Sequence, residues 1–457
     1  MALKSTDLNS DGLRSKIAGR AILPGEPDYD AARAVFYGGV DKRPRLIVRA
    51  ANADDVARVI SFASESDAEL AIRSGGHSGA AHCVSDGGIV LDMRDLRSVG
   101  IDLEGSTAWA GSGATAAEYS LATAAHGLAT GFGDTGSVGL GGLVLGGGVG
   151  YLSRKYGLTI DDLLAADVVT ADGELRRVDA EHDPDLFWAI RGGGGNFGVV
   201  TRFLLSLHPV GTVVGGMLIL PATAPLIRSF VELADAAPEE LSTIANVMPA
   251  PPMPFLPAEH HGKLVIMALM VHCGDVEAGQ RAVAPFRALA TPLVDMLRPM
   301  SYPEIYPPED PAYHPIAAGR TLFVDEVDER SADAILDHLE SSRAYLRVAQ
   351  IRVLGGAIAR VPVEATAFAH RKRKIMVNVA ALYERREDAK EHQEWVDRFA
   401  AALQRGPVGA YVNFLNDEGP ARVRDAYPKA TWDRLVAIKR RYDPTNLFHM
   451  NQNVPPD

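Results

Sequence analysis

The sequence predicts an α+β protein of two domains, in which the second domain carries an antiparallel sheet covered by helices. Two observations lead to this fold class. Over residues 1–206 short strand patterns alternate with short helix patterns, and from about residue 207 longer β-branched runs alternate with amphipathic helices. The length also fits, because 457 residues with 47% hydrophobic and 23% charged side chains exceed one ordinary domain and can bury sizeable cores.

The first part contains a helix followed by a strand that ends in glycines. Asn52 is a predicted N-cap of an amphipathic helix, and a strand over residues 69–73 follows it. Thr115 and Glu118 have the spacing of a capping box, which predicts a second helix that ends at Gly127.

Farther along the first part, a hairpin and another helix are predicted. The turn Ala171-Asp-Gly173 joins strand patterns over residues 165–170 and 174–178. Asp183-Pro184 then begins a helix that runs to Ile190, and a further strand starts at Val199.

In the second part, the strand patterns are longer. They cover residues 212–220 and 263–272, and the amphipathic helices of this part cover residues 223–236 and 328–342. Residues 249–257 and 299–315 are rich in proline and predict loops. The tyrosines of the second loop either line a pocket or simply pack, and these are Tyr302, Tyr306 and Tyr313.

Three elements complete the chain. They are a helix over residues 384–404, a strand over residues 408–414 and a helix over residues 431–440.

Charge and composition exclude several classes of partner. With 46 basic against 58 acidic side chains the formal charge is −12, and the densest basic cluster is only residues 371–374, so nucleic acid is not expected. The start of the chain, residues 1–7, lacks the apolar segment of a secretory signal, and no run of apolar residues is long enough to cross a membrane. We therefore expect a soluble, cytoplasmic protein. Cys83 and Cys273, the two cysteines, predict neither a disulfide framework nor a metal site.

Glycine is concentrated in three segments, residues 74–79, 131–150 and 192–198. Residues 131–136 match the dinucleotide fingerprint literally, but a helix precedes them and more glycine follows, so a Rossmann fold is not favoured. Glycine clusters persist where the backbone must approach another group closely or adopt positive φ. A large flat cofactor with a pyrophosphate would explain them, and three tight turns without a ligand are the alternative.

His77 is the candidate nucleophile. It follows a predicted strand and is flanked by glycines in Arg73-Ser-Gly-Gly-His-Ser78, so its ring is accessible. A neutral imidazole nitrogen is a competent nucleophile and could add to the activated methyl group of an oxidised flavin. Such a bond would anchor the cofactor and make it a stronger oxidant.

Four blocks together resemble one family. They are Arg73-Ser-Gly-Gly-His-Ser78, residues 138–157 with their run of glycines, residues 185–198 with Gly-Gly-Gly-Gly-Asn-Phe-Gly198, and Tyr442-Asp-Pro-Thr-Asn-Leu-Phe448 followed by Asn451 and Asn453. In this order they resemble the FAD-linked oxidases of the vanillyl-alcohol-oxidase superfamily, which have a PCMH-type FAD-binding domain. The specific match is to the berberine-bridge-enzyme-like group and its bacterial members with a single histidyl flavin link.

The resemblance implies a division of the chain and a set of cofactor contacts. Residues 1–206 would form the FAD-binding domain, residues 207–404 the substrate domain, and residues 405–457 a segment that completes the FAD domain. His77 would be the covalent attachment site. The residues implied in FAD binding are Ile72, Arg73, Ser74, Gly75, Gly76, His77, Ser78, Thr135, Val138, Gly139, Gly142, Gly198, Val200, Asn451 and Asn453.

Two of these positions carry chemical information. Many members have a second, cysteinyl attachment where this chain has Thr135, and threonine cannot form the thioether, so a single link is expected. Val138 matches a position where a small side chain leaves dioxygen access to the reduced flavin, which favours an oxidase over a dehydrogenase.

The catalytic residues are harder to assign. Residues 411–414 resemble the family's Tyr-x-Asn-Tyr strand, but Phe414 replaces a tyrosine that could exchange a proton. Asn378 is the nearest polar candidate where plant members have a glutamate. The candidates that orient the substrate are therefore Tyr411, Asn413, Asn378 and Tyr151, with a hydrogen-bonded structural pair as the alternative for Tyr411 and Asn413.

The function implied by the resemblance is hydride removal from a small organic substrate, followed by reoxidation with dioxygen to give hydrogen peroxide. A weakly basic site suits an amine bound in its neutral form. The alternatives are a flavin-dependent monooxygenase or oxidative cyclase, a carbohydrate or alcohol oxidase, and a flavin-binding protein without catalysis.

Overall fold

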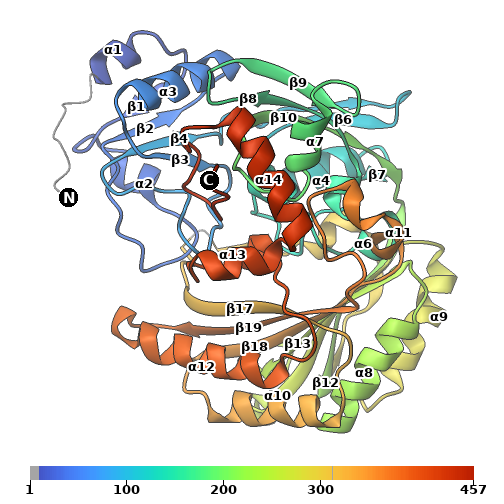
Figure 1. The fold of residues 1–457 in the computed structure, drawn as a ribbon. Coiled ribbons are helices and arrows are strands. Elements are labelled where there is room, and N and C mark those ends of the chain that lie inside the picture. The colour runs from blue at the N-terminus through green and yellow to red at the C-terminus, as the bar shows by residue number, and fades with distance from the viewer. Residues whose placement is uncertain (1–9, 311) are drawn as a thin grey trace.

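The computed structural model describes residues 10–310 and 312–457, and within them the strands form four sheets (Figure 1). One sheet is mixed, two are antiparallel and lie mainly in the first half, and the largest lies in the second half. The predicted α+β class is confirmed. Residues 1–7, for which no secretory signal was predicted, lie outside the described residues.

The mixed sheet delivers the His77 loop. Its strands in spatial order are β1 (Arg20–Ile22), β2 (Leu46–Arg49), β4 (Ile89–Asp92) and β3 (Leu70–Arg73). Strands β2, β4 and β3 run parallel, as expected for strands joined through helix α3 (Ala53–Glu65). Asn52 caps this helix by accepting the Asp55 N–H at 2.9 Å, as predicted.

The five-stranded antiparallel sheet contains the predicted hairpin. Its strands in spatial order are β5 (Val99–Asp102), β6 (Thr107–Gly111), β10 (Val199–Ser206), β8 (Leu163–Val169) and β9 (Leu175–Asp179). Beside it, helix α4 (Ala116–Ala124) has the predicted capping box between Thr115 and Glu118. The pair β7 (Leu128–Ala129) and β11 (His208–Pro209) forms a small separate sheet.

Helix α7 (Pro184–Ala189) begins at the predicted proline, but its cap differs from the prediction. Asp183 adopts a left-handed φ of 49° and its side chain does not cap the helix. Instead, its carboxylate accepts the Tyr442 hydroxyl at 2.8 Å. This contact joins the start of α7 to the end of the chain.

The largest sheet is antiparallel throughout. Its strands in spatial order are β15 (Val294–Asp295), β12 (Thr212–Pro221), β14 (Leu264–His272), β13 (Leu241–Pro249), β18 (Leu346–Val353), β19 (Ile375–Tyr383) and β17 (Ile316–Val324), with β16 (Arg298–Ser301) also paired to β12. Four helices cover one face, as the sequence predicts: α8 (Ala224–Ala236), α9 (Val276–Arg287), α10 (Glu329–Ser341) and α12 (Ala389–Leu403). The segment 299–315, predicted to be all loop, contributes β16 and the 3₁₀ turn η3 (Tyr302–Ile305).

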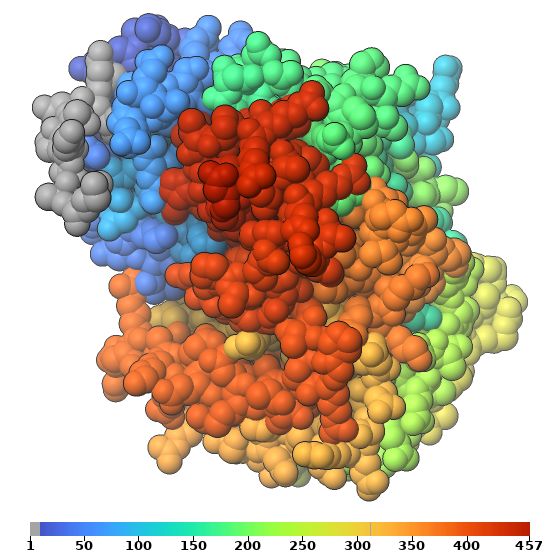
Figure 2. All heavy atoms as spheres, in the orientation of Figure 1, coloured from blue at the N-terminus to red at the C-terminus, as the bar shows by residue number. Residues whose placement is uncertain are grey.

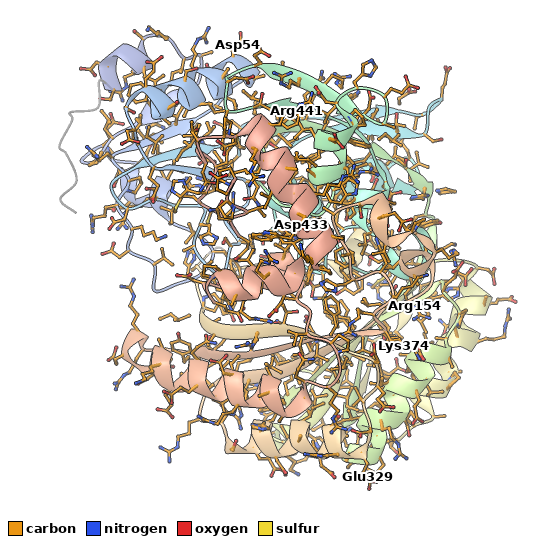
Figure 3. The ribbon with its side chains drawn as sticks, viewed as in Figure 1. Asp54, Arg154, Glu329, Lys374, Asp433 and Arg441 are labelled. Carbon is orange, nitrogen blue, oxygen red and sulfur yellow. The ribbon has the colours of Figure 1, made fainter. Side chains whose placement is uncertain are left out.

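The opposite face of this sheet meets the first half of the chain. Arg154, from helix α6 (Ser153–Tyr156), lies at the junction in Figure 3. Its guanidinium donates to the carbonyl oxygens of Leu354 at 2.5 Å and Ala237 at 2.9 Å. The two halves are thereby joined by side chains that satisfy main-chain groups.

The end of the chain returns to the first half. Helices α13 (Pro420–Ala426) and α14 (Lys429–Tyr442) and the tail lie against the N-terminal sheets, and Figure 2 shows this segment spread between them. The predicted strand over residues 408–414 is wrong: residues Val412–Phe414 form a 3₁₀ turn, η6. The alternating apolar pattern is real, but the side chain of Tyr411 bonds to Gly148 and that of Asn413 to Leu143. No strand among the described residues pairs with this segment.

Among the described residues, no helix is long and apolar enough to cross a membrane. Neither cysteine is in a disulfide, and the described part of the chain shows no cluster of histidine, cysteine and carboxylate side chains that could hold a metal ion.

Candidate active site

All three glycine segments meet at helix α5 (Leu140–Gly146). Ser74 Oγ accepts the N–H of Gly141 at 3.2 Å, which joins the first segment to the second. Gly192 and Gly194 donate their N–H groups to the Leu145 carbonyl at 2.9 and 3.0 Å, which joins the third. Segments up to 120 residues apart in the chain therefore build one main-chain surface.

The contact between the first two segments requires glycine on both sides. A Cβ atom on Gly75 would lie 2.3 Å from Gly139 N, and one on Gly139 would lie 2.1 Å from Gly75 N. Gly76 next to it has a φ of +78°, which disfavours any other residue. By contrast, a Cβ on Gly142 would meet nothing within 4 Å, so the surface of α5 is open there.

His77 lies at the end of the loop that follows β3. The ring of Phe36 stacks on its imidazole with centroids 4.1 Å apart. Its Nε2 atom lies 2.9 Å from Ser137 Oγ, and that hydroxyl in turn bonds to the carboxylate of Glu309. Burial lowers the pKa of His77 to about 4, so the ring is neutral near pH 7, as a nucleophile must be.

The other predicted residues of the first loop have mainly structural contacts. The Arg73 guanidinium is buried and donates to Asp92 at 2.8 Å, so only the main chain of Arg73 is free to contact a cofactor. Ile72 is half-buried in β3 and packs on α3, and the Ser78 hydroxyl accepts the His82 N–H at 3.3 Å.

In the second and third segments, the predicted residues lie around α5. Thr135 donates to Asp134 at 3.4 Å, and the Val138 carbonyl accepts from Ala116 N at 3.0 Å. Gly198 has a φ of +157° and packs against Val168, while Val200 is buried in β10.

A buried lysine ties the tail to the third glycine segment. Lys439 donates to Asp443 at 2.7 Å and to the carbonyl groups of Asn196 at 2.8 Å and Phe448 at 2.9 Å. Asn196 Oδ1 accepts the Val454 N–H at 2.8 Å. Both side chains of the Lys439–Asp443 pair are fully buried, and burial lowers the pKa of Lys439.

This arrangement places Asn451 and Asn453 near the glycine surface. The Oδ1 atoms of both side chains are buried and have no hydrogen-bond partner among the described residues. A buried acceptor without a donor costs about 1–3 kcal/mol, so a bound molecule that donates to these atoms would remove the cost.

Tyr411 and Asn413 bond to α5 and the glycines after it. The Tyr411 hydroxyl accepts from Gly148 N at 2.8 Å and from Asn413 Nδ2 at 3.0 Å, and Asn413 Nδ2 also donates to the Leu143 carbonyl at 3.1 Å. The pair therefore supports the glycine segment, and the proton of the Tyr411 hydroxyl is left for another acceptor. Burial raises the pKa of Tyr411, so the phenol is neutral.

A row of polar side chains crosses the face of the largest sheet that meets the first half of the chain. Asn246, Gln350 and Asn378 are paired in register on β13, β18 and β19. Gln350 Nε2 donates to Asn246 Oδ1 at 3.0 Å. The side chain of Asn378 has no hydrogen-bond partner within the described structure, so its amide can bind a substrate.

Arg352 and Asp134 connect this sheet to the glycine segment. Arg352 donates to Asp134 Oδ2 and to the carbonyl of Val149, at 2.5 and 3.2 Å. Tyr151 is 1% exposed, and its hydroxyl has no partner among the described residues. Burial, and to a lesser extent the Asp134 carboxylate, raises the pKa of Tyr151. This polar cluster lies between the sheet and the glycine surface.

Sequence reasoning missed Asp134, Arg352 and Glu309. No motif links them to their partners, since Arg352 and Asp134 are 218 residues apart and Glu309 is 172 residues from its partner Ser137. The only signal was the charge of Asp134 inside the glycine segment. Of the loop tyrosines, Tyr302 and Tyr306 pack in a buried cluster with Tyr151.

Known families match the two ends of the chain. Residues 44–179 match a family described as "FAD binding domain", and residues 410–455 match one described as "Berberine and berberine like". The chain is 30% identical to (R)-6-hydroxynicotine oxidase of Paenarthrobacter nicotinovorans over 96% of this chain and 97% of that protein. It belongs to the berberine-bridge-like family of FAD-linked oxidoreductases.

Solved structures of this family have the same fold. The crystal structure of 6-hydroxy-D-nicotine oxidase from Arthrobacter nicotinovorans superposes with a TM-score of 0.85 at 28% identity, covering 96% of this chain and 98% of that one. A berberine-bridge-like protein of Physcomitrella patens, at 22% identity, gives a TM-score of 0.86 over 98% of this chain and 99% of that one. As a member of this family, the chain is an FAD-binding oxidase.

The residues present fit FAD. Three glycine segments leave an open main-chain surface at Gly142, and the unpaired acceptors of Asn451 and Asn453 suit the N–H and O–H donors of a flavin dinucleotide.

Proposed function

We propose that this oxidase holds FAD through a covalent bond to His77 and removes a hydride from a small organic amine or alcohol, with dioxygen as the final acceptor and hydrogen peroxide as the product. The observation that carries the proposal is the imidazole of His77, which is neutral, fixed by Phe36 and Ser137, and next to the glycine surface.

The proposed roles of the three segments of the chain are those expected from the sequence. Residues 1–206 and 405–457 bind FAD, and residues 207–404 bind the substrate. The main chain of residues 72–78 and the segment from Gly139 to Gly142 would hold the cofactor, with Asn451 and Asn453 accepting its hydrogen bonds. When bound, FAD supplies the acceptor for the hydride and the site where dioxygen is reduced.

The side chains on the substrate side would orient the substrate rather than remove a proton from it. The free amide of Asn378 and the hydroxyl of Tyr151 can each bond to a polar group of the substrate. The carboxylate of Asp134 is already paired with Arg352. A neutral amine fits such a site, because its own lone pair promotes loss of hydride from the adjacent carbon.

Single attachment and oxidase chemistry remain part of the proposal. Thr135 has no thiol, so His77 would be the only link. The partially buried side chain of Val138, which packs at the edge of the glycine-side core, would leave room for dioxygen.

The cytoplasmic location predicted from the sequence is checked by fractionating cells of the source organism.

The visible spectrum of acid-precipitated protein tests the attachment. We expect a yellow pellet from the wild-type chain and a colourless pellet from His77→Ala, with the released flavin in the supernatant. A colourless wild-type pellet would contradict covalent attachment.

Peroxide measurement separates this proposal from its alternatives. An oxidase produces one hydrogen peroxide per oxidised substrate, whereas a monooxygenase transfers an oxygen atom to its product. A panel of amines, alcohols and oligosaccharides assayed for peroxide would identify the substrate class. No turnover with any of them, although the flavin is reduced by dithionite, would favour a binding protein.

A further inference from the structure

A chain of two hydrogen bonds runs from His77 to a carboxylate in the other half of the molecule. The imidazole Nε2 lies 2.9 Å from Ser137 Oγ, and Ser137 Oγ bonds to Glu309 Oε2. Ser137 N also donates to Glu309 Oε1 at 3.1 Å, so the carboxylate faces Ser137 with both oxygens. No hydrogen-bond partner of His77 Nδ1 is found among the described residues.

The directions of these bonds follow from the protons available. An ionised carboxylate only accepts, so the single hydroxyl proton of Ser137 points to Glu309. Ser137 Oγ can then only accept from His77, which places the ring proton on Nε2. The lone pair is left on Nδ1, and this nitrogen becomes the nucleophile.

The position of Glu309 depends on the docking of its loop. His314 Nδ1 lies 3.0 Å from the carbonyl oxygen of Phe36, and Gly38 N donates to the Pro315 carbonyl at 2.9 Å. The ring of Phe36 stacks on His77, so the same contacts hold the imidazole and the carboxylate. The active nitrogen is therefore set only when the two halves are assembled.

We propose that Ser137 and Glu309 are positioning residues for flavin attachment, which select Nδ1 of His77 as the nucleophile and take up the Nε2 proton as the bond forms. This inference rests on the proposed covalent link at His77. Its consequence is that the middle of the chain controls a reaction whose nucleophile lies in the FAD-binding part.

The reaction balances with dioxygen as the oxidant. One N–H bond of the imidazole and one C–H bond of the flavin 8-methyl group are broken, and one N–C bond is formed. The two protons and two electrons released reduce dioxygen to hydrogen peroxide. The imidazole proton leaves through Ser137 to Glu309, which explains why a carboxylate ends the relay.

Glu309→Gln is the most informative variant, because it should reverse the direction of both hydrogen bonds that join Glu309, Ser137 and His77. A glutamine can keep its Oε1 on Ser137 N and donate from Nε2 to Ser137 Oγ, which frees the serine proton to bond to His77 Nε2. That arrangement puts the ring proton on Nδ1 and blocks the nucleophile.

The experiment follows flavin incorporation into full-length, flavin-free protein after FAD is added. Intact mass under denaturing conditions gives the covalent fraction, and absorbance of the native protein gives total bound FAD. We expect Ser137→Ala and Glu309→Gln to form the adduct at least about 10-fold more slowly while still binding FAD. Ser137→Thr, which keeps a hydroxyl, should restore the rate. Glu304→Gln is the matched control, since Glu304 lies on the same segment but pairs with Arg298.

A second readout identifies the linked nitrogen by NMR of the isolated flavin peptide. We expect Nδ1 in the wild-type chain and some Nε2 linkage in the residual adduct of Glu309→Gln. Wild-type rates in both Ser137→Ala and Glu309→Gln, or linkage through Nε2 in the wild type, would overturn the relay while leaving covalent attachment intact. A wild-type chain without any adduct would instead overturn the proposed attachment, and the relay with it.

Discussion

The glycine surface around α5 and the face of the largest sheet that meets the first half of the chain form the two sides of the proposed active site, but they are built in different ways. The glycine side consists of main chain, with Gly75 and Gly139 in contact and the Leu145 carbonyl holding the third segment. The sheet side consists of side chains, such as Asn378 and Arg352, whose partners come from other strands. In the proposed function, the backbone shape of the glycine side would select the cofactor, and the side chains of the sheet would select the substrate.

The largest expected effect concerns the buried Lys439–Asp443 pair, which ties the tail of the chain to the glycine surface. Lys439→Met leaves Asp443 buried without a counterion, which should lower the free energy of unfolding by about 3–5 kcal/mol. Chemical denaturation measures it. Lys429→Met makes the same change at an exposed pair on the same helix, and there we expect less than about 0.5 kcal/mol. Equal effects of the two substitutions would show that the buried pair is unimportant.

The next effect distinguishes packing from cofactor contact within the glycine surface. Gly139→Ala puts a methyl group against main chain and should destabilise the flavin-free protein by about 2 kcal/mol or more. Gly142→Ala meets open space, so it should leave stability unchanged or raise it by up to about 1 kcal/mol, yet lower the flavin content. Thermal unfolding and flavin absorbance check both. Normal flavin binding by Gly142→Ala would mean that the cofactor lies elsewhere.

On the sheet side, a substitution should change turnover without affecting the flavin. Asn378→Ala removes an amide that has no protein partner, so kcat/KM should fall about 10-fold with an unchanged covalent fraction. Thr321→Val is the control, because Thr321 is the neighbour in register but is fully buried. If Asn378→Ala lost flavin instead, the division between the two sides would be wrong.

The smallest expected effect is that of pH on the rate of flavin incorporation, which should change little. Burial lowers the pKa of His77 to about 4, so the imidazole stays neutral and flavin incorporation should change less than about 2-fold from about pH 8 to about pH 5.5. An ordinary histidine with a pKa of 6.5 would retain only about a tenth of its neutral form at the lower pH. The sign for stability is also set: as pH falls from 6.5 towards 4, the unfolded chain binds a proton that the folded chain does not, and stability decreases. A tenfold fall in the incorporation rate over this range would contradict the burial of His77.

The same contrast explains what the sequence could predict. Some features depend on neighbouring residues alone, and the sequence shows them. The caps at Asn52 and Thr115 and the helices of the second part are confirmed, and the glycine segments lie together in the structure. The strand predicted at residues 408–414 failed because the contacts of Tyr411 with Gly148 and of Asn413 with α5 override the local alternation. Asp134, Arg352 and Glu309 act through partners distant in the chain, which a local pattern does not reveal.

Peptide mapping after trypsin digestion tests the central claim most directly. Cleavage after Arg73 and Arg94 gives one peptide that contains both His77 and His82, and fragmentation separates the two histidines. We predict that this peptide from the wild-type chain carries one flavin on His77, and that it is unmodified in His77→Ala. A flavin on His82, or an unmodified wild-type peptide, would contradict the account.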